Sequence, residues 1–381
     1  MVNQNLKRQT PVKPVLYASS LLTQHASGQL DSVYADGIFN NVTELQMYDI
    51  INGDPSQVSE IQLDLTGASS GMLFWRIQPS NITESDAIDG VVEGAFRYFN
   101  GNQHFAAILG HDLFSSGLNV KIFELSRPDA TAGDPSSPLP GSTDIQMIDS
   151  VQQEINYPHG GVLSYDGWSM RRGGSWGATD NDLWIGFFVV ADVWTSPTVN
   201  IGSCFMGSWY SFPHNCDLST TAQFDWNVKQ KKTIKGKTIS SLNYERPNDW
   251  ILPAWNLSEN PSITASPKFM GRSGLRSWKL SYSFLDHEQV MSRNLMLNDN
   301  NVTALDSSDS EFDSAWAETR NNLFTNIMQK TRGNHLPFIL QLDANSTNPD
   351  NFAVVRASKR YKIKQISPDL YSVQLDLVEQ V

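Results

Sequence analysis

Three groups of residues in the sequence have types and spacings that could carry chemistry. The first is Gly67-Ala-Ser-Ser-Gly71, which matches the Gly-x-Ser-x-Gly pattern of a nucleophilic serine between a strand and a helix. Strand character precedes the match, but Met72–Ile77 after it also has strand character. Because the pattern positions its serine only when a helix follows, we interpret the stretch as a hairpin turn.

The second group is the pair His104 and His111, at the two ends of one apolar segment. Their odd separation places the side chains on opposite faces of a strand, so the two cannot hold one metal ion together. His111 is followed by Asp112, an acid and base in type, but the spacing places no nucleophile beside them. We interpret His111 as a loop residue that follows a buried strand.

The third group, Cys204, His214 and Cys216, has the ligand types of a partial zinc site. A structural zinc site needs four ligands, and these are the only two cysteines in the chain. Whether the two cysteines pair stays open at this point. The sequence also lacks phosphate-binding, dinucleotide-binding and His-Glu-x-x-His motifs, and no carboxylate pair is singled out for glycoside hydrolysis. We therefore predict no catalytic, cofactor-binding or metal-binding residues.

The composition indicates the kind of element that surrounds these residues. The chain has 381 residues, with 40% hydrophobic and 18% charged side chains, and is rich in Ser, Thr and Asn. This favours β structure with polar turns and a chain long enough for two domains. Eleven Trp and eleven Tyr residues suit either sandwich cores or contact surfaces for partners or sugars.

The charge and the apolar runs limit the partners. A net charge of −12 argues against nucleic acid as a stably bound partner. Only Lys229–Lys237 is locally basic; its alternation predicts a hairpin, with lysines protecting a solvated edge strand. The N-terminus lacks the apolar segment of a signal peptide, and Leu183–Trp194 is too short to span a bilayer. We expect synthesis in a cytoplasm and no membrane insertion.

The order of strand signals predicts a mainly β protein with two β-sandwich-type domains. Residues 1–55 form either an arm that packs on a neighbour or the first strands of the fold. Residues 56–200 form one sandwich, in which Leu183–Val193 is apolar on both faces and therefore central. Residues 201–381 form the second β domain, and the sequence predicts a single helix near residues 310–332 within it.

The helix has clear boundaries in the sequence. Ser308 and Glu311 have the spacing of a capping box, and Lys330 and Arg332 fall in the last turn, where cations suit the helix dipole. Gly333 follows as the terminator. One apolar face is predicted, made by Phe312, Trp316, Leu323 and Ile327.

A second signature precedes the helix, in Gly271–Leu285. Gly271, Arg272 and Gly274 belong to a flexible lead-in to a strand. Alternation then places four apolar side chains on one face of that strand, and we expect this face to pack under the helix 312–327. The four residues are Trp278, Leu280, Tyr282 and Phe284.

Two regions resemble structural proteins of tailed bacteriophages. Residues 60–200 resemble galactose-binding-like jelly rolls of phage structural proteins in the segment 104–113, followed by Leu183–Val193 and Ile201–Gly207. Residues 201–381 are similar to tail-tip and distal-tail proteins. That similarity rests on the Gly-Arg loop into the Trp278 strand, the single helix, and a strand opening with Leu336, Pro337 and Phe338.

The resemblance implies a virion structural protein of the tail tip. Such a protein forms a homo-oligomeric ring, a trimer or hexamer, between the tail tube and the hub, fibre or receptor-binding components. DNA would pass through its lumen only as transient cargo, and the protein would reside in the virion tail.

Two other functions remain open from the sequence. The first is a carbohydrate-binding module for host surface glycans, because Tyr165, Trp168 and Trp176 lie in a Gly-rich segment and flat aromatic faces suit sugar stacking. The second is a glycan-cleaving enzyme, for which the sequence offers no acid and base.

Overall fold

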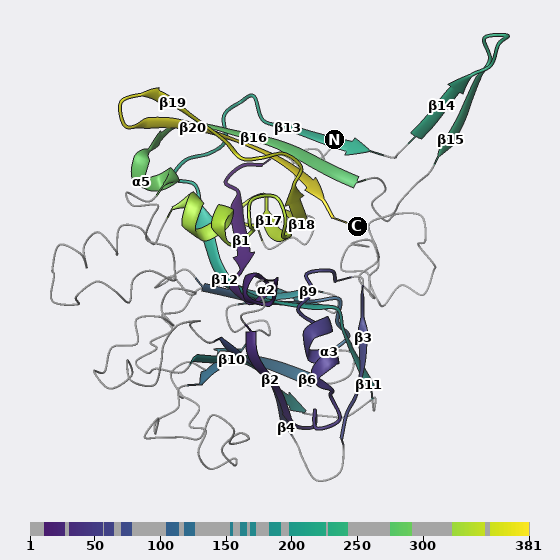
Figure 1. Ribbon diagram of the computed structural model, residues 1–381, viewed down its shortest axis with the longest axis vertical. Coiled ribbons are helices and arrows are strands. Elements are labelled where there is room, and N and C mark those ends of the chain that lie inside the picture. The colour runs from purple at the N-terminus through teal and green to yellow at the C-terminus, as the bar shows by residue number, and fades with distance from the viewer. Residues whose placement is uncertain are drawn as a thin grey trace.

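The computed structural model is mainly β, and its strands pair antiparallel, consistent with the predicted β-sandwich class (Figure 1). Among the residues that the structure describes, no helix has the length and apolar character needed to cross a membrane. The structure describes residues 11–26, 30–55, 57–64, 70–77, 104–113, 118–125, 153–154, 161–165, 168–172, 183–191, 198–225, 228–242, 275–291, 322–346 and 351–380.

The largest sheet has eleven strands, and the strand β19 (Lys362–Ser367) pairs with β20 beside the main path. Along that path the strands are β13 (Thr221–Asp225), β16 (Leu275–Asp286), β20 (Leu370–Glu379), β18 (Phe352–Ala357), β17 (Phe338–Gln341), β1 (Val15–Ser19), β12 (Ser203–Ser211), β5 (His104–Leu109), β9 (Trp168–Arg172) and β8 (Gly161–Tyr165).

Three smaller sheets and four helical segments complete the described fold. The five-stranded sheet contains β2 (Leu30–Gly37), β4 (Ser70–Ile77), β10 (Leu183–Ala191), β6 (Leu118–Leu125) and β7 (Gln153–Glu154). The two-stranded sheets are β3 (Ser59–Gln62) with β11 (Thr198–Ile201), and β14 (Val228–Lys232) with β15 (Thr238–Leu242). The helical segments are α2 (Ser20–Ala26), α3 (Glu44–Asp49), α5 (His287–Val290) and the π-helical η3 (Phe324–Gln329).

The N-terminal strand β1 lies in the middle of the large sheet. It pairs with β12 on one side and with β17 on the other, and all five of its residues are buried. Of the two alternatives for residues 1–55, residues 15–19 therefore form a strand of the fold. The sheet also joins β5, β8 and β9 to strands beyond residue 200, so its hydrogen bonding crosses the predicted boundary between 56–200 and 201–381.

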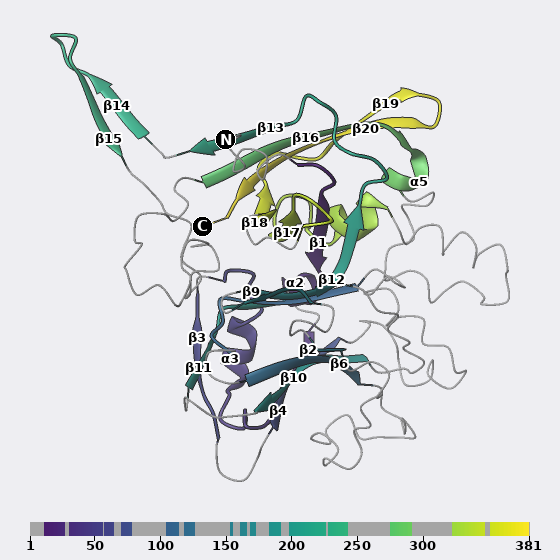
Figure 2. The same ribbon diagram turned by 180° about the vertical axis from the view of Figure 1, so that it is seen from behind.

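A sandwich occupies one half of the molecule. The five-stranded sheet faces the β12, β5 and β9 portion of the large sheet (Figures 1 and 2), and β10 is central between β4 and β6, as predicted. One apolar core lies between these layers, and the Trp75 indole N–H donates to the Met47 carbonyl of α3 at 3.2 Å. This core includes Leu73, Trp75, Ile108, Leu118, Cys204 and Met206.

The other half is built on β16 and its neighbours. Trp278, Leu280 and Tyr282 are buried in one core with Leu323 and Ile327, so the described end of the predicted helix packs where expected. Phe312, Trp316 and the capping box lie outside the described residues, as do Gly271, Arg272 and Gly274.

The prediction for Phe284 is wrong. Its side chain is 69% exposed and its φ is +62°, while the register with β20 shifts between Tyr282 and Leu285. A bulge adds one residue to a strand and reverses the inward and outward positions beyond it. Leu285 consequently takes the buried position that alternation assigns to its neighbour.

The end of the helix also differs from the prediction. The helical segment η3 ends at Gln329 with Lys330 as its C-cap, before the predicted terminator Gly333. Gly333 lies in the turn that follows, with φ +74° and its N–H donating to the Met328 carbonyl at 2.9 Å. Lys330 at this end is buried. Its Nζ donates to the hydroxyls of Ser20, at 2.9 Å, and Ser208, at 2.5 Å, and so links the helical segment to α2 and β12.

Candidate interaction site

His111 lies in the loop that follows the buried strand β5, as we expected, and its side chain belongs to the core. Its side chain is fully buried; Nδ1 accepts the Leu113 N–H at 3.3 Å, and Nε2 lies 2.9 Å from the Ser169 Oγ. Because Nδ1 accepts, Nε2 carries the proton and donates to Ser169. Burial lowers the pKa of His111 to about 3, so the ring is neutral at physiological pH and serves as a hydrogen-bonding link between the loop after β5 and β9.

The cysteines and His214 do not assemble the partial zinc site. Cys204 and Cys216 are free thiols that belong to separate cores. The Cys216 thiol donates to the Tyr282 hydroxyl at 3.0 Å, and burial raises the pKa of both thiols. His214 Nδ1 lies 2.9 Å from the Asn215 carbonyl oxygen. Within the described residues, no three His, Cys, Asp or Glu side chains are grouped to hold a metal ion.

The serine pattern is followed by a strand, but the predicted hairpin is wrong, because β3 before the match pairs with β11 while β4 after it pairs with β2 and β10 in another sheet. β4 begins at Ser70, immediately after Ser69, which lies outside the described residues. The structure therefore gives the Gly-x-Ser-x-Gly match no helix on its C-terminal side.

The aromatic residues predicted to contact glycans are not available as a set. Trp168 is 1% exposed and packs against Phe352, with ring centroids 5.9 Å apart, so the prediction that it stacks on a sugar is wrong. Its backbone pairs with that of Tyr165 in the β8–β9 hairpin, and Trp176 lies outside the described residues. The alternation of β9 directs Trp168 and Met170 into one core.

Pro337 and Phe338 of the predicted signature are buried where β17 begins. A Cβ added to Gly53 would lie 2.9 Å from the Pro337 Cγ, and Gly53 has a φ of +78°. The prolyl ring therefore packs directly on a backbone turn that only glycine accommodates. Like Trp278, Leu280 and Tyr282, these residues build the core rather than a binding site.

The most prominent exposed feature is the hairpin β14–β15, predicted from Lys229–Lys237. Its strands pair from Val228 with Leu242 to Lys232 with Thr238. Figures 1 and 2 show this hairpin projecting away from the rest of the molecule. It is a separate two-stranded sheet, and not an edge of a larger sheet as we predicted.

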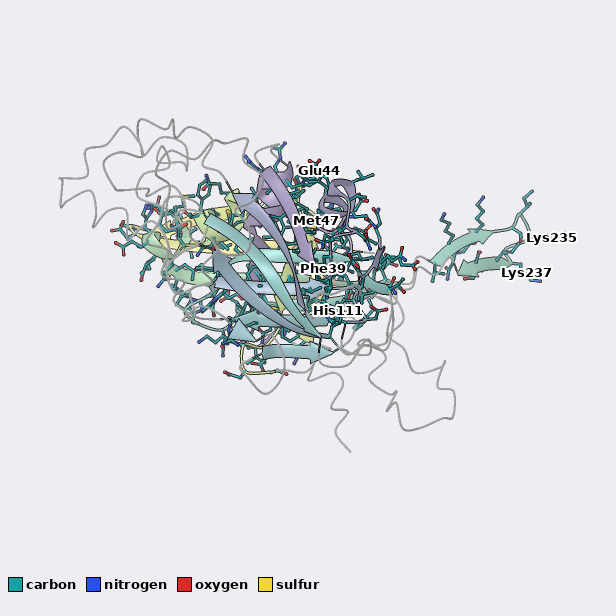
Figure 3. The ribbon with its side chains drawn as sticks, turned by 90° about the horizontal axis from the view of Figure 1, so that it is seen from below. Phe39, Glu44, Met47, His111, Lys235 and Lys237 are labelled. Carbon is teal, nitrogen blue, oxygen red and sulfur yellow. The ribbon has the colours of Figure 1, made fainter. Side chains whose placement is uncertain are left out.

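The turn of the hairpin is well defined. The Thr233 N–H donates to the Lys237 carbonyl at 2.8 Å, and the Lys237 N–H donates to the Thr233 hydroxyl at 3.1 Å. Gly236 has a φ of +78°, which a turn of this kind requires. These bonds hold Lys235 and Lys237 at the far tip, which Figure 3 shows.

The surface of the hairpin combines positive charge with apolar side chains. Register places Lys229, Lys231 and Ile239 on one face, and Ile239 is 56% exposed. Ile234 at the turn is fully exposed, next to Lys235. Within the described part of the chain, none of the five lysines at 229, 231, 232, 235 and 237 has an ion-pair partner.

The sequence analysis did not predict the helices α2, α3 and α5, and of these α3 has the clearest signal in the sequence. Its N-cap Thr43 accepts the Gln46 N–H at 3.3 Å, and the Thr43 N–H donates to the Gln46 side-chain oxygen at 3.0 Å. This capping box is visible in the sequence as Thr43-Glu-Leu-Gln46, so the signal was present.

In comparisons with known proteins, no family model, no curated protein and no solved structure matches the chain.

Proposed function

We propose that the chain is a structural protein of a bacteriophage tail tip. It assembles as a homo-oligomeric ring, a trimer or hexamer, which joins the tail tube to hub, fibre or receptor-binding components. In this proposal its two parts correspond to a jelly-roll sandwich and a tail-ring-like β domain, and DNA crosses the lumen only as cargo.

The observation that carries the proposal is the β14–β15 hairpin. A two-stranded hairpin is marginally stable alone, and every described strand side chain in this one is exposed. The lysine and isoleucine side chains of the hairpin therefore make few stabilising contacts within their own molecule. An arm of this kind gains its interactions from another molecule, as the extended arms of assembling proteins do.

The buried polar groups give further support for a role in holding shape. Lys330, His111 and the pair Arg276–Glu379 are inside the protein and hydrogen-bonded to other elements. Groups placed this way fix the geometry of neighbouring strands, since each buried charge or ring must keep its partners. This suits a subunit whose shape defines a ring.

The test is the oligomeric state of the purified full chain, combined with mass spectrometry of particles from the virus that encodes it. We expect a closed oligomer of three or six copies by native mass spectrometry and a matching stoichiometry in the particles. A chain that is monomeric at all salt concentrations and absent from particles overturns the proposal.

A further inference from the structure

We propose that the β14–β15 hairpin of one copy docks on the acidic surface around α3 and β3 of a second copy. The inference rests on the proposed homo-oligomer and names the two surfaces that meet in it. It follows from three observations: the charge distribution along the chain, the composition of the two surfaces, and their placement in one molecule.

The charges of the chain are distributed unevenly. Residues 1–200 contain 9 Lys or Arg and 22 Asp or Glu, and residues 201–381 contain 19 and 18, which together give the 28 and 40 of the whole chain. Five of the 19 basic residues lie between Lys229 and Lys237. The hairpin is therefore the most basic segment of a chain whose first half is strongly acidic, and the two attract each other.

The surface around α3 complements the hairpin in chemistry. Glu44 and Asp49 at the two ends of the helix are exposed, and so is Glu60 on β3. The Gln46 side chain donates to the Glu60 carbonyl at 3.1 Å, which holds the strand beside the helix. Leu45, 70% exposed, lies next to Glu44, so this surface combines an apolar side chain with carboxylates.

The hairpin offers the matching arrangement. Ile234 lies beside Lys235 at the tip, and Ile239 shares a face with Lys229 and Lys231. An isoleucine against Leu45 removes apolar surface from water on both sides, while the lysines reach the surrounding carboxylates. Lysine stems also cover apolar surface when their ammonium groups reach outward.

The two surfaces lie apart within one molecule. In Figures 1 and 2 the hairpin projects from the half that contains β16, whereas α3 and β3 lie in the sandwich half. Figure 3 shows Lys235 and Lys237 at the tip of the arm, away from Glu44 on the body. When each copy gives its hairpin to the next copy in one direction, the contact is heterologous, and its repetition generates a ring when the rotation closes.

The experiment reverses the charges on each surface of the full chain. The hairpin variant is Lys229→Glu, Lys231→Glu, Lys235→Glu and Lys237→Glu, and the partner variant is Glu44→Lys, Asp49→Lys and Glu60→Lys. A third chain carries both sets. The control variant is Lys362→Glu with Lys364→Glu, because these two lysines are exposed on β19.

Oligomer dissociation is measured by analytical ultracentrifugation at low and physiological salt. We expect each single-surface variant to raise the dissociation constant about tenfold or more, and the chain with both reversals to recover most of that loss, since the charges are complementary again. The control should stay within about twofold of the wild type. Circular dichroism should be the same for all variants, because the altered side chains are exposed.

The outcomes separate the two proposals. A wild-type chain that is monomeric throughout overturns the proposed function itself. A wild-type oligomer that the hairpin variant forms equally well overturns only the docking inference. Loss of assembly that the combined reversals do not recover also overturns it, and shows that the hairpin contacts a different surface of the neighbouring copy.

Discussion

The Arg276 guanidinium and the Glu379 carboxylate form a buried, multiply bonded ion pair between β16 and β20. Nη2 lies 2.7 Å from one carboxylate oxygen, and Nε lies 3.2 and 3.1 Å from the two oxygens. Nη2 also donates to the Phe352 carbonyl of β18 at 2.8 Å. The guanidinium stacks over Trp278 at 4.9 Å, so one side chain links three adjacent strands.

Removing one partner of this pair should be far more costly than replacing both. We expect Glu379→Gln to lower the free energy of unfolding by about 3–5 kcal/mol, because it leaves a buried guanidinium without its counter-charge. Arg276→Met combined with Glu379→Leu should recover most of this loss. Urea unfolding of the single and double variants measures both values; a double variant as unstable as Glu379→Gln would contradict the expectation.

His111 should make stability depend on pH in the acidic range. Burial lowers its pKa from 6.5 to about 3 in the folded protein, so the unfolded chain binds this proton at a higher pH. The stability contribution is complete above pH 6.5 and is lost as pH falls from there towards 3, by about 1.4 kcal/mol per pH unit.

The matched variant is His111→Gln, which has no titrating ring. Its free energy of unfolding should be below that of the wild type at pH 7, and the difference should shrink as the pH is lowered to 5. Urea unfolding at pH 7, 6 and 5 measures this. Parallel pH profiles for the two proteins would contradict the assignment.

Lys330 should contribute far more to stability than an exposed lysine. We expect Lys330→Met to lower the free energy of unfolding by about 2–3 kcal/mol, because the ammonium hydrogen bonds to Ser20 and Ser208 are lost inside the protein. Lys359→Met is the control: that lysine pairs with Asp376 at 3.0 Å but its side chain is 75% exposed. Its loss should be below about 1 kcal/mol. Thermal unfolding compares the two, and equal losses would argue against the buried role.

Two glycines should respond differently to alanine. A Cβ at Gly207 would lie 2.1 Å from the Ala18 carbonyl oxygen and 2.6 Å from the Ser20 nitrogen, so β1 and β12 would have to separate. We expect Gly207→Ala to cost about 3 kcal/mol or more. Gly236 has open space around it and only an unfavourable φ of +78°, so Gly236→Ala should cost about 1 kcal/mol. Chemical unfolding of both variants tests the contrast.

Local patterns in the sequence predicted several of the strands, because such patterns depend on neighbouring residues. Alternation placed Trp278, Leu280 and Tyr282 inside, and the basic stretch 229–237 indicated its hairpin. The bulge at Phe284 could not be predicted in the same way, because it depends on the register with β20.

The errors concern positions that distant partners decide. Trp168 is buried against Phe352, which is distant in sequence. The buried ammonium group of Lys330 donates hydrogen bonds to Ser20 and Ser208, which are 310 and 122 residues away in sequence. The residues that neighbour Trp168 and Lys330 in the sequence do not indicate these distant contacts. The helix α3 was also missed, although its capping box depends only on the neighbouring residues Thr43 to Gln46 and is visible in the sequence.

The central place of β1 has a consequence for biosynthesis. Tyr17 donates to the Gln341 side chain across 324 residues of sequence, and β1 also pairs with β12 near residue 209. During translation β1 emerges before the strands that it pairs with, and Gln341 of its second neighbour follows Tyr17 by 324 residues. The large sheet can therefore close only late in synthesis or after release from the ribosome. Such long-range pairing makes folding slow and leaves the apolar N-terminal strand in need of protection, which favours chaperone assistance during production.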